Sequence, residues 1–454
     1  MDRTGLHKLL NLEIGPGSPG FIIYSEKQST RLNYVSKFIF EIVLKVNANI
    51  TTTLSEFESS KLFKINYSSK SIANTFQILP HTLLFENGLS EIKPKAILKN
   101  DLVYFFENEN PSNFKYDVFS SVFYFISRYE EWQAFETDIH NRFEAKESIL
   151  FKNNLHLKPV VDIWIQELKN ELERFFKEIN FPKNKFKVIS TIDVDNLYAY
   201  KEKGFLRTAG AICKDLLKFD FTNLKNRSTV LSKKTDDPFD IYSSVSEFCL
   251  DKKIPLIYFF LFRSGTKYDR TVDPNSNAFV EVFKRIKEHS AFIGLHPSYN
   301  SSVNKDLLIH EQNMLAQKAN EKITLSRQHY LRFNIRTTPA QLMQNGFVAD
   351  FTMGFASSPG FRAGTSFPFY YYDFGTEQQK ELLFVPFCAM DGAYFVYDKL
   401  SPDAMLKSLL NLAKEVKKVN GLFVSVFHER TFSNHLYPGY DRIYKNLHQS
   451  IDEL

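Results

Sequence analysis

Short apolar runs alternate with segments of helical length from about residue 187 to the end of the sequence. Strands buried on both faces of a parallel sheet have this continuous apolar composition, and helices usually connect them. Seven such runs predict strands: Phe186–Ile192, Pro255–Phe262, Ala291–Leu295, Ile323–Ser326, Phe347–Ala349, Leu382–Phe387 and Gly421–Phe427. The segments between them include Asp240–Asp251, Asn277–His289, Lys305–Asn320 and Pro402–Val419. Residues 187–454 are therefore predicted to form an α/β domain, and seven strands favour a distorted (β/α)7-type barrel over an open sheet.

The pattern before this region is different and predicts a smaller α+β domain over residues 21–180. A short buried strand at Gly20–Tyr24 precedes an amphipathic helix around Leu32–Val46, and several short β-like runs follow. Two further helices are indicated by apolar stripes at helical spacing. The stripes are Val118, Val122, Phe125 and Tyr129 in the first helix, and Val161, Trp164, Leu168, Leu172 and Phe175 in the second. No chemistry is indicated in this domain.

Two segments outside these domains contain residues that disfavour regular structure. Gly and Pro are frequent in residues 14–20, and residues 1–20 lack the apolar core of a secretory signal, so we expect a loose leader there. Residues 180–186 are predicted to connect the two domains. The C-terminal domain is then expected to fold alone after cleavage of this connector.

Charge and cysteine content narrow the function classes. The net charge is +5, and the basic residues look scattered rather than gathered in a stripe, so a nucleic-acid partner is not expected. No run approaches the roughly 20 apolar residues of a transmembrane helix, so an integral membrane segment is not expected either. The three cysteines are far apart and form no disulfide or thiolate pattern, which favours a reducing, cytoplasmic location.

Ionisable residues follow the predicted strands, one strand after another. They are Asp193, Asp195, His296, Arg327, His329, Asp350, Asp391 and His428. The carboxyl ends of the strands of a parallel barrel meet at one mouth, where active sites are built. A single strand-end Asp can simply cap the following helix, and a single His can be structural. Together, these carboxylates, imidazoles and guanidinium predict a site that holds a divalent ion and moves protons.

Four short motifs at these positions resemble those of the polysaccharide deacetylases, carbohydrate esterase family four. The sequence at 191–195 (Thr-Ile-Asp-Val-Asp) resembles the first motif, 296–300 (His-Pro-Ser-Tyr-Asn) the second, and 327–330 (Arg-Gln-His-Tyr) the third. Phe427-His428 resembles the fifth. The fourth motif is placed at Asp350 or within residues 360–365. The resemblance covers roughly residues 187–429 and is closest to a bacterial branch with an uncharacterised N-terminal domain.

The resemblance implies a role for each of these residues. Asp193 would be the general base, and His428 the acid that protonates the leaving amine. Arg327 and Asp350 would tune that base and acid. Asp195 and His296 would bind the metal, with zinc expected, and Tyr299, Arg362 and Asp391 would contact substrate. The family implies hydrolysis of N-acetyl groups from an amino sugar, in a surface polysaccharide or its lipid- or nucleotide-linked precursor.

Three departures from the family motifs leave alternatives open. Val194 separates the two aspartates, Asn300 stands where a second metal histidine is expected, and His329 replaces a proline. Catalytic zinc usually has three protein ligands, so either His329 or Asp193 would supply the third. One alternative function is a catalytically silent barrel that binds glycan or supports glycan assembly. Another is glycoside hydrolysis, which also uses paired carboxylates.

Overall fold

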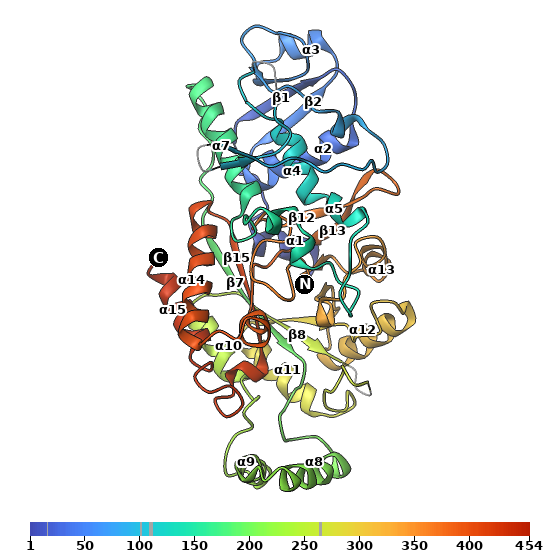
Figure 1. Cartoon of the computed structure of the whole chain (residues 1–454), viewed down its shortest axis with the longest axis vertical. Helices are drawn as coiled ribbons and strands as arrows, with labels where there is room; N and C mark the ends of the chain where they lie inside the picture. The colour runs from blue at the N-terminus through green and yellow to red at the C-terminus, as the bar shows by residue number, and fades with distance from the viewer. Residues whose placement is uncertain (16, 100–101, 109–111, 263–265) are drawn as a thin grey trace.

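The computed structural model describes residues 1–15, 17–99, 102–108, 112–262 and 266–454 (Figure 1). The N-terminal part contains a parallel four-stranded sheet of order β2-β1-β3-β4. Its strands are β1 (Gly20–Ser25), β2 (Asn47–Thr51), β3 (Phe63–Tyr67) and β4 (Phe76–Gln77), and β5 (Ile97–Lys99) pairs with β6 (Leu102–Tyr104). Its helices are α2 (Thr30–Ser36) with the π-helix η1 (Lys37–Val43), α3 (Leu54–Ser59), η2 (Thr82–Phe85), α4 (Val118–Ile126), α5 (Tyr129–Trp132), η3 (Ala145–Glu147), α6 (Ile149–Lys152) and α7 (Val160–Phe175). The helices expected at both apolar stripes are therefore confirmed.

A nine-stranded sheet forms the C-terminal part, with the order β12-β13-β11-β10-β9-β8-β7-β15-β14. The seven predicted strands are all present, as β7 (Lys187–Val194), β8 (Leu256–Leu261), β9 (Phe292–His296), β10 (Leu325–Ser326), β11 (Ala349–Asp350), β13 (Gln378–Phe384) and β15 (Leu422–His428). Parallel pairing joins them, and β15 pairs with β7 so that His428 is in register with Asp193. The carboxyl ends of the strands thus share one edge.

The distorted (β/α)7-type barrel expected from the sequence is a curled nine-stranded sheet that does not close into a ring. Two short strands escaped prediction: β14 (Ala389–Met390), which adds an eighth parallel strand beside β15, and β12 (Phe369–Asp373). β12 runs antiparallel to β13 and occupies the edge that β14 would need in order to close the ring. Around the sheet lie α10 (Tyr242–Asp251), α11 (Ala278–Glu288), α12 (Lys305–Ala319), η4 (His329–Leu331), α13 (Thr338–Gln344), η5 (Ala393–Tyr397), α14 (Pro402–Lys418), η6 (Glu429–Phe432) and α15 (Ile443–Asp452). None of the described helices has the length and apolar character needed to cross a membrane.

The first residues are ordered, in contrast to the loose leader expected from the sequence. Residues Arg3–Leu10 form α1, whose first turn is capped by Asp2 accepting the N–H of Gly5. Leu6 and Leu10 are buried against the sheet in one apolar cluster. The helix lies at the amino ends of the strands, where Lys187 donates to the carbonyl oxygen of Leu9. It therefore covers the end of the sheet opposite the mouth.

The N-terminal and C-terminal parts share one continuous apolar core. A buried ion pair joins Arg31 to Glu377 at 2.7 Å, and Tyr34 donates a hydrogen bond to the carbonyl oxygen of Tyr370. The domain boundary at residues 180–186 stays a prediction. These contacts indicate that the two parts pack as extensively as elements of a single core.

Candidate metal centre and active site

A cleft of about 640 Å³ opens at the carboxyl ends of the strands. Five of the predicted site residues line it: Asp193, Asp195, His296, His329 and His428. Aromatic and cationic side chains form much of its rim, among them Arg142, Lys267, Tyr268, Arg270, Tyr330, Phe395, Tyr397 and Arg430. The parallel register therefore brings residues that are far apart in the sequence into one depression.

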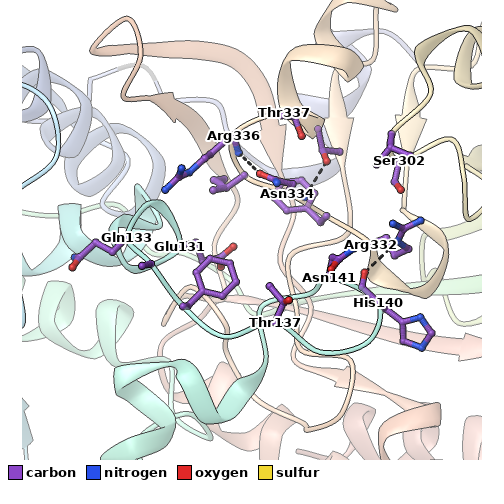
Figure 2. A pocket seen from close by; sticks show the side chains of 16 residues that line it. Glu131, Gln133, Thr137, His140, Asn141, Ser302, Arg332, Asn334, Arg336 and Thr337 are labelled. Carbon is purple, nitrogen blue, oxygen red and sulfur yellow. Dashed lines mark hydrogen bonds between the residues drawn. The ribbon is translucent and has the colours of Figure 1, made fainter. Parts of the chain in front are cut away.

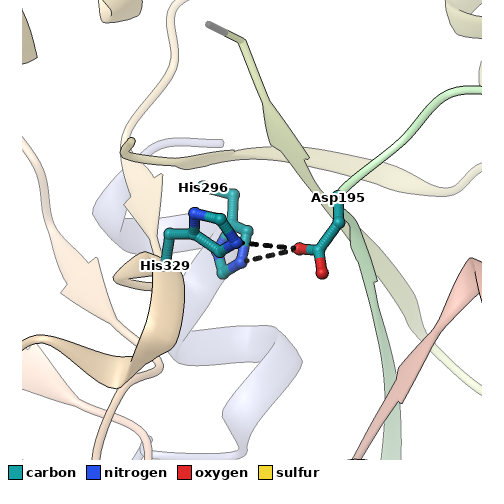
Figure 3. A group of neighbouring side chains, drawn as sticks. All are labelled: Asp195, His296 and His329. Atoms are coloured by element: carbon teal, nitrogen blue, oxygen red, sulfur yellow. Dashed lines mark ion pairs between the residues drawn. The ribbon is translucent and has the colours of Figure 1, made fainter. Parts of the chain in front are cut away.

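Three of these side chains converge on one point in the cleft (Figure 3). Asp195 follows β7, His296 ends β9, and His329 begins η4 directly after β10. Nε2 of His296 and Nε2 of His329 each lie 3.4 Å from Oδ1 of Asp195. All three donor atoms lie within 4.8 Å of one another. The candidate third ligand is thus His329, supplied at the position where the family pattern has proline.

Hydrogen bonds orient both imidazole rings. Nδ1 of His296 lies 2.6 Å from the carbonyl oxygen of Arg327, and Nδ1 of His329 lies 2.9 Å from Oδ1 of Asp269. Because those oxygens accept, Nδ1 is the donor in each ring, and Nε2 is the nitrogen that faces Asp195. Metal-ligating histidines are commonly anchored in this way through the other ring nitrogen. Burial lowers the pKa of His329, which favours the neutral ring that a metal ligand requires.

The carboxylate of Asp195 has one oxygen satisfied and one left open. Oδ2 accepts a hydrogen bond of 2.6 Å from Arg430, whereas the buried Oδ1 has no hydrogen-bond partner among the described residues. Burial opposes ionisation, but the Arg430 guanidinium holds the pKa of Asp195 well below its ordinary value. The open oxygen of this carboxylate therefore faces the Nε2 atoms of two imidazole rings. A divalent cation fits this donor set, which has the three protein ligands typical of catalytic zinc.

Asp193 lies beside this group and is held by a buried guanidinium. Arg327 is fully buried and donates to Oδ1 of Asp193 at 2.7 Å and to the hydroxyl of Thr191 at 2.8 Å. The guanidinium packs over the ring of Phe259, 4.6 Å from its centroid. Oδ2 of Asp193 lies 4.0 Å from Nε2 of His296. Asp193 therefore presents one oxygen to the cleft while Arg327 occupies the other.

His428 is paired with Asp391 rather than with Asp350. Nδ1 of His428 lies 2.6 Å from Oδ1 of Asp391, and the backbone N–H of His428 donates to Oδ2 at 2.7 Å. Burial disfavours the imidazolium, but the Asp391 carboxylate outweighs it and raises the pKa of His428 to about 9. For Asp391 burial acts in the opposite direction, and the charge of His428 lowers its pKa. The imidazole is therefore protonated at neutral pH.

Four of the expected roles are not supported by these positions. Asp350 accepts from Ser326 and from the backbone N–H of Thr352, and it makes no contact with His428 among the described residues. Asp391 is fully buried behind His428, so it cannot reach substrate directly. Asp391 follows β14, and β14 pairs with β15, which ends at His428. Asp391 rather than Asp350 therefore lies beside His428.

Arg362 and Tyr299 also lie outside the cleft. Arg362 is buried and makes a bidentate pair with Glu131, at 2.8 and 2.6 Å, so it joins the two parts of the chain. Tyr299 stacks on Tyr268 with ring centroids 4.0 Å apart, and its hydroxyl forms a hydrogen bond with His140. It therefore packs against the rim residue Tyr268. Neither side chain therefore lines the cleft.

Sequence reasoning missed several residues that shape the site. Arg430 and Glu429 directly follow His428, and the same strand-end rule that selected His428 would have found them. Burial and the Asp195 charge raise the pKa of Glu429 to about 8, and Glu429 accepts the backbone N–H of Asp195. Asp269 stands in a loop with no sequence signal.

Arg142 comes from the N-terminal part and was likewise not predicted. It lies in a loop whose ends form a bridge between Thr137 and Phe143, and it pairs with Asp138. Its guanidinium donates to the carbonyl oxygen of Tyr330 and to the hydroxyl of Tyr397. The residues 137–143 thus complete one wall of the cleft.

A second pocket of about 580 Å³ lies on the other side of this loop (Figure 2). Amide, hydroxyl and guanidinium groups line it, and Arg332 donates to the carbonyl oxygen of His140. Its carboxylate, Glu131, is already paired with Arg128 and Arg362. The described residues contain one candidate metal-binding group, and it lies in the first cleft. We therefore place the candidate site there.

Comparisons with known proteins give a family match for one part of the chain only. Residues 21–177 match a family of unknown function (DUF7033). No curated protein matches the chain.

Solved structures resemble the fold at low identity. A Mycobacterium smegmatis protein assigned as a polysaccharide deacetylase is 14% identical, with a TM-score of 0.38, and the match covers 60% of this chain and 86% of that one. A polysaccharide deacetylase from Bacillus cereus is 11% identical, with a TM-score of 0.30, and the match covers 59% of this chain and 88% of that one. A family 4 carbohydrate esterase from Streptomyces lividans, solved in complex with acetate, is 9% identical, with a TM-score of 0.29, and the match covers 59% of this chain and 91% of that one.

Proposed function

We propose that this protein is a metal-dependent hydrolase that removes N-acetyl groups from an amino sugar of a surface polysaccharide or its precursor. One observation carries the proposal: the open Oδ1 of Asp195 faces the Nε2 atoms of His296 and His329. Asp195, His296 and His329 would hold the ion, with zinc the expected metal. When bound, such an ion lowers the pKa of water and polarises a carbonyl oxygen.

Asp193 is the proposed general base. Arg327 occupies its Oδ1, so Oδ2 is the atom that takes a proton from water. The hydrogen bond from the guanidinium also fixes the orientation of this carboxylate. One positioned proton-transfer group typically contributes 10²–10⁴-fold to rate.

His428 is the proposed general acid. Its Nδ1 proton is engaged by Asp391, so Nε2 is the nitrogen that presents a proton to the leaving amine. Because the pKa of His428 is raised to about 9, the proton is in place at neutral pH. The base and the acid stand on the adjacent strands β7 and β15, in register with each other.

The rim of the cleft supports a sugar as substrate. Tyr268 and Tyr330 present aromatic surface beside polar groups, which suits a ring with both apolar and hydroxyl faces. Lys267 and Arg270 make no ion pair within the part of the chain that is described, so their charges are available for a phosphate. Lipid- and nucleotide-linked precursors are therefore included in the proposed substrate class.

An acetate-release assay combined with elemental analysis tests the proposal. Purified protein loaded with zinc or cobalt is offered N-acetylated amino-sugar oligomers, and released acetate is measured beside metal content. We expect metal-dependent release that falls by about 10²–10⁴-fold in Asp193→Asn while the metal is retained. If the metal binds but no acetylated amino sugar releases acetate, the cleft is instead that of a silent glycan-binding protein.

A further inference from the structure

Two helices form a hairpin that extends away from the rest of the molecule. They are α8 (Phe205–Leu217) and α9 (Phe221–Leu231), inserted between β7 and α10. In Figure 1 they lie at the end of the molecule opposite the four-stranded sheet. The carboxylate of Asp237 holds the base of the hairpin, accepting the backbone N–H groups of Ala199, Tyr200 and Lys201. The hairpin thus projects from the molecule and does not cover the nine-stranded sheet.

An apolar surface on this hairpin is left uncovered. Phe205, Leu206 and Leu217 are 86%, 83% and 81% exposed. Further exposed apolar residues on the hairpin are Leu216, Phe219, Phe221 and Leu231. At about 100° per residue, positions 205, 206, 216 and 217 fall within about a third of the circumference of α8. Contiguous exposed apolar surface of this kind marks an interaction site.

Basic residues lie beside the apolar surface. Between Lys203 and Lys234 there are eight Lys or Arg and two Asp or Glu, a net charge of +6, whereas the whole chain carries +5. Arg207 and Lys214 of α8 and Lys218, which directly follows it, are exposed and share a narrow strip beside the apolar third. The positive charge that looked scattered along the sequence is therefore concentrated on this projection.

We propose that the α8–α9 hairpin binds the surface of an anionic lipid bilayer. Helices that lie in the membrane interface combine a Phe- and Leu-rich face with a face rich in Lys and Arg. The apolar side chains would enter the acyl boundary, and the basic strip would contact negative headgroups. A nucleic acid as partner would account for the basic residues but not for the exposed apolar side chains. A second copy of the hairpin would bring two segments together that each carry a net charge of +6.

This proposal is independent of the chemistry proposed for the cleft, because none of the site residues belongs to the hairpin. The two are nevertheless connected in space. The segment leading to α8 begins at Asp195, and Arg207 donates to the carbonyl oxygens of Thr271 and Arg270 at the rim. Docking of the hairpin would bring that rim toward the lipid surface.

Vesicle co-sedimentation tests the proposal with the full-length protein. Vesicles of phosphatidylcholine alone are compared with vesicles that contain about a third phosphatidylglycerol. We expect binding to the anionic vesicles, weakened by salt, and little binding to the neutral ones. The variant Leu206→Ser/Leu217→Ser should bind at least tenfold more weakly, since both side chains are exposed and their loss leaves the fold intact.

Two further variants test whether binding depends on the charge of the hairpin and on its position in the molecule. Lys214→Gln/Lys218→Gln should weaken anionic binding by roughly tenfold or more at low salt, because each charge near the surface contributes. Leu98→Ser/Val303→Ser removes two apolar side chains that are 72% and 71% exposed elsewhere, and should leave vesicle binding unchanged.

Three results would overturn the proposal. The first is no binding to anionic vesicles, and the second is binding that survives Leu206→Ser/Leu217→Ser. The third is light scattering that shows a dimer without lipid which becomes a monomer in that variant, because the apolar surface would then contact a second copy. Circular dichroism confirms that each variant is folded.

Discussion

The pairing of His428 with Asp391 gives a quantitative prediction. In Asp391→Asn the side chain keeps its shape, but the negative charge beside Nδ1 of His428 is removed. That charge is what raises the pKa of His428 to about 9 against the effect of burial. Without it, we expect the pKa to fall to the ordinary value of about 6.5 or lower.

The size of the effect follows from that shift. A change from about 9 to about 6.5 corresponds to ~3 kcal/mol between the two protonation states. At pH 7.5 the protonated fraction of the imidazole would fall from roughly 97% to roughly 9%, so the rate should fall about tenfold. At pH 5.5 the rate should fall by only about a tenth of its value. While Asp391 is ionised, the raised pKa of His428 stabilises the fold fully below about pH 6.5, and this stabilisation is lost as pH rises through about 9.

The measurement is kcat/KM for acetate release between about pH 5 and 10. The midpoint of the alkaline limb, where activity falls, should move from about pH 9 to about pH 6.5 or below in Asp391→Asn. Asp350→Asn is the matched control, because Asp350 is an equally buried strand-end carboxylate that does not touch His428. An NMR titration of the His428 ring follows the same shift without turnover. A limb that stays near 9 in Asp391→Asn would refute the assigned pairing.

Three further predictions follow. His296→Ala or His329→Ala should each remove the bound metal without unfolding the chain, as measured by elemental analysis and circular dichroism, because each supplies one of three donors. Arg362→Ala should lower the free energy of unfolding by about 3–5 kcal/mol in denaturant titrations, since it leaves Arg128 alone to balance the buried carboxylates of Glu130 and Glu131, while metal content stays unchanged. Proteolysis within residues 181–186 should give two fragments that remain associated on gel filtration, because the apolar core crosses this segment.

The controls for these predictions also come from the chain. His310→Ala changes an exposed histidine outside the metal group and should leave the bound metal in place. Metal content unchanged in both His296→Ala and His329→Ala would place the ion elsewhere. A C-terminal fragment that separates and keeps its secondary structure would support two independent domains. An Arg362→Ala variant as stable as the wild type would mean that water reaches Glu131.

Local patterns predicted most of the barrel strands and strand-end residues. A buried strand needs a continuous apolar run, and parallel pairing then brings its carboxyl end to the common edge, so Asp193, Asp195 and His296 could be placed from the sequence. His329 was among the expected ligands for the same reason. β14 has only two residues, Ala389 and Met390, and this is too short a pattern to show that the neighbouring Asp391 would meet His428.

Contacts between distant segments could not be predicted. The pair formed by Arg362 and Glu131 joins positions 231 apart, and nothing near either residue indicates its partner. The burial of α1 depends on an apolar surface at the amino ends of the strands, which exists only after the sheet has formed. The amphipathic spacing of α8, by contrast, is present in the sequence and was overlooked because charge was considered over the whole chain.

The loop at residues 137–143 has a consequence for how this protein can diverge. Arg142 belongs to the N-terminal part, yet it forms a wall of the cleft that holds the candidate metal centre. A barrel exchanged for one from another lineage would lose that wall, and a foreign N-terminal part would not restore the contacts with Tyr330 and Tyr397. The two parts are therefore expected to be inherited together, with substitutions in the loop matched by changes on the facing rim.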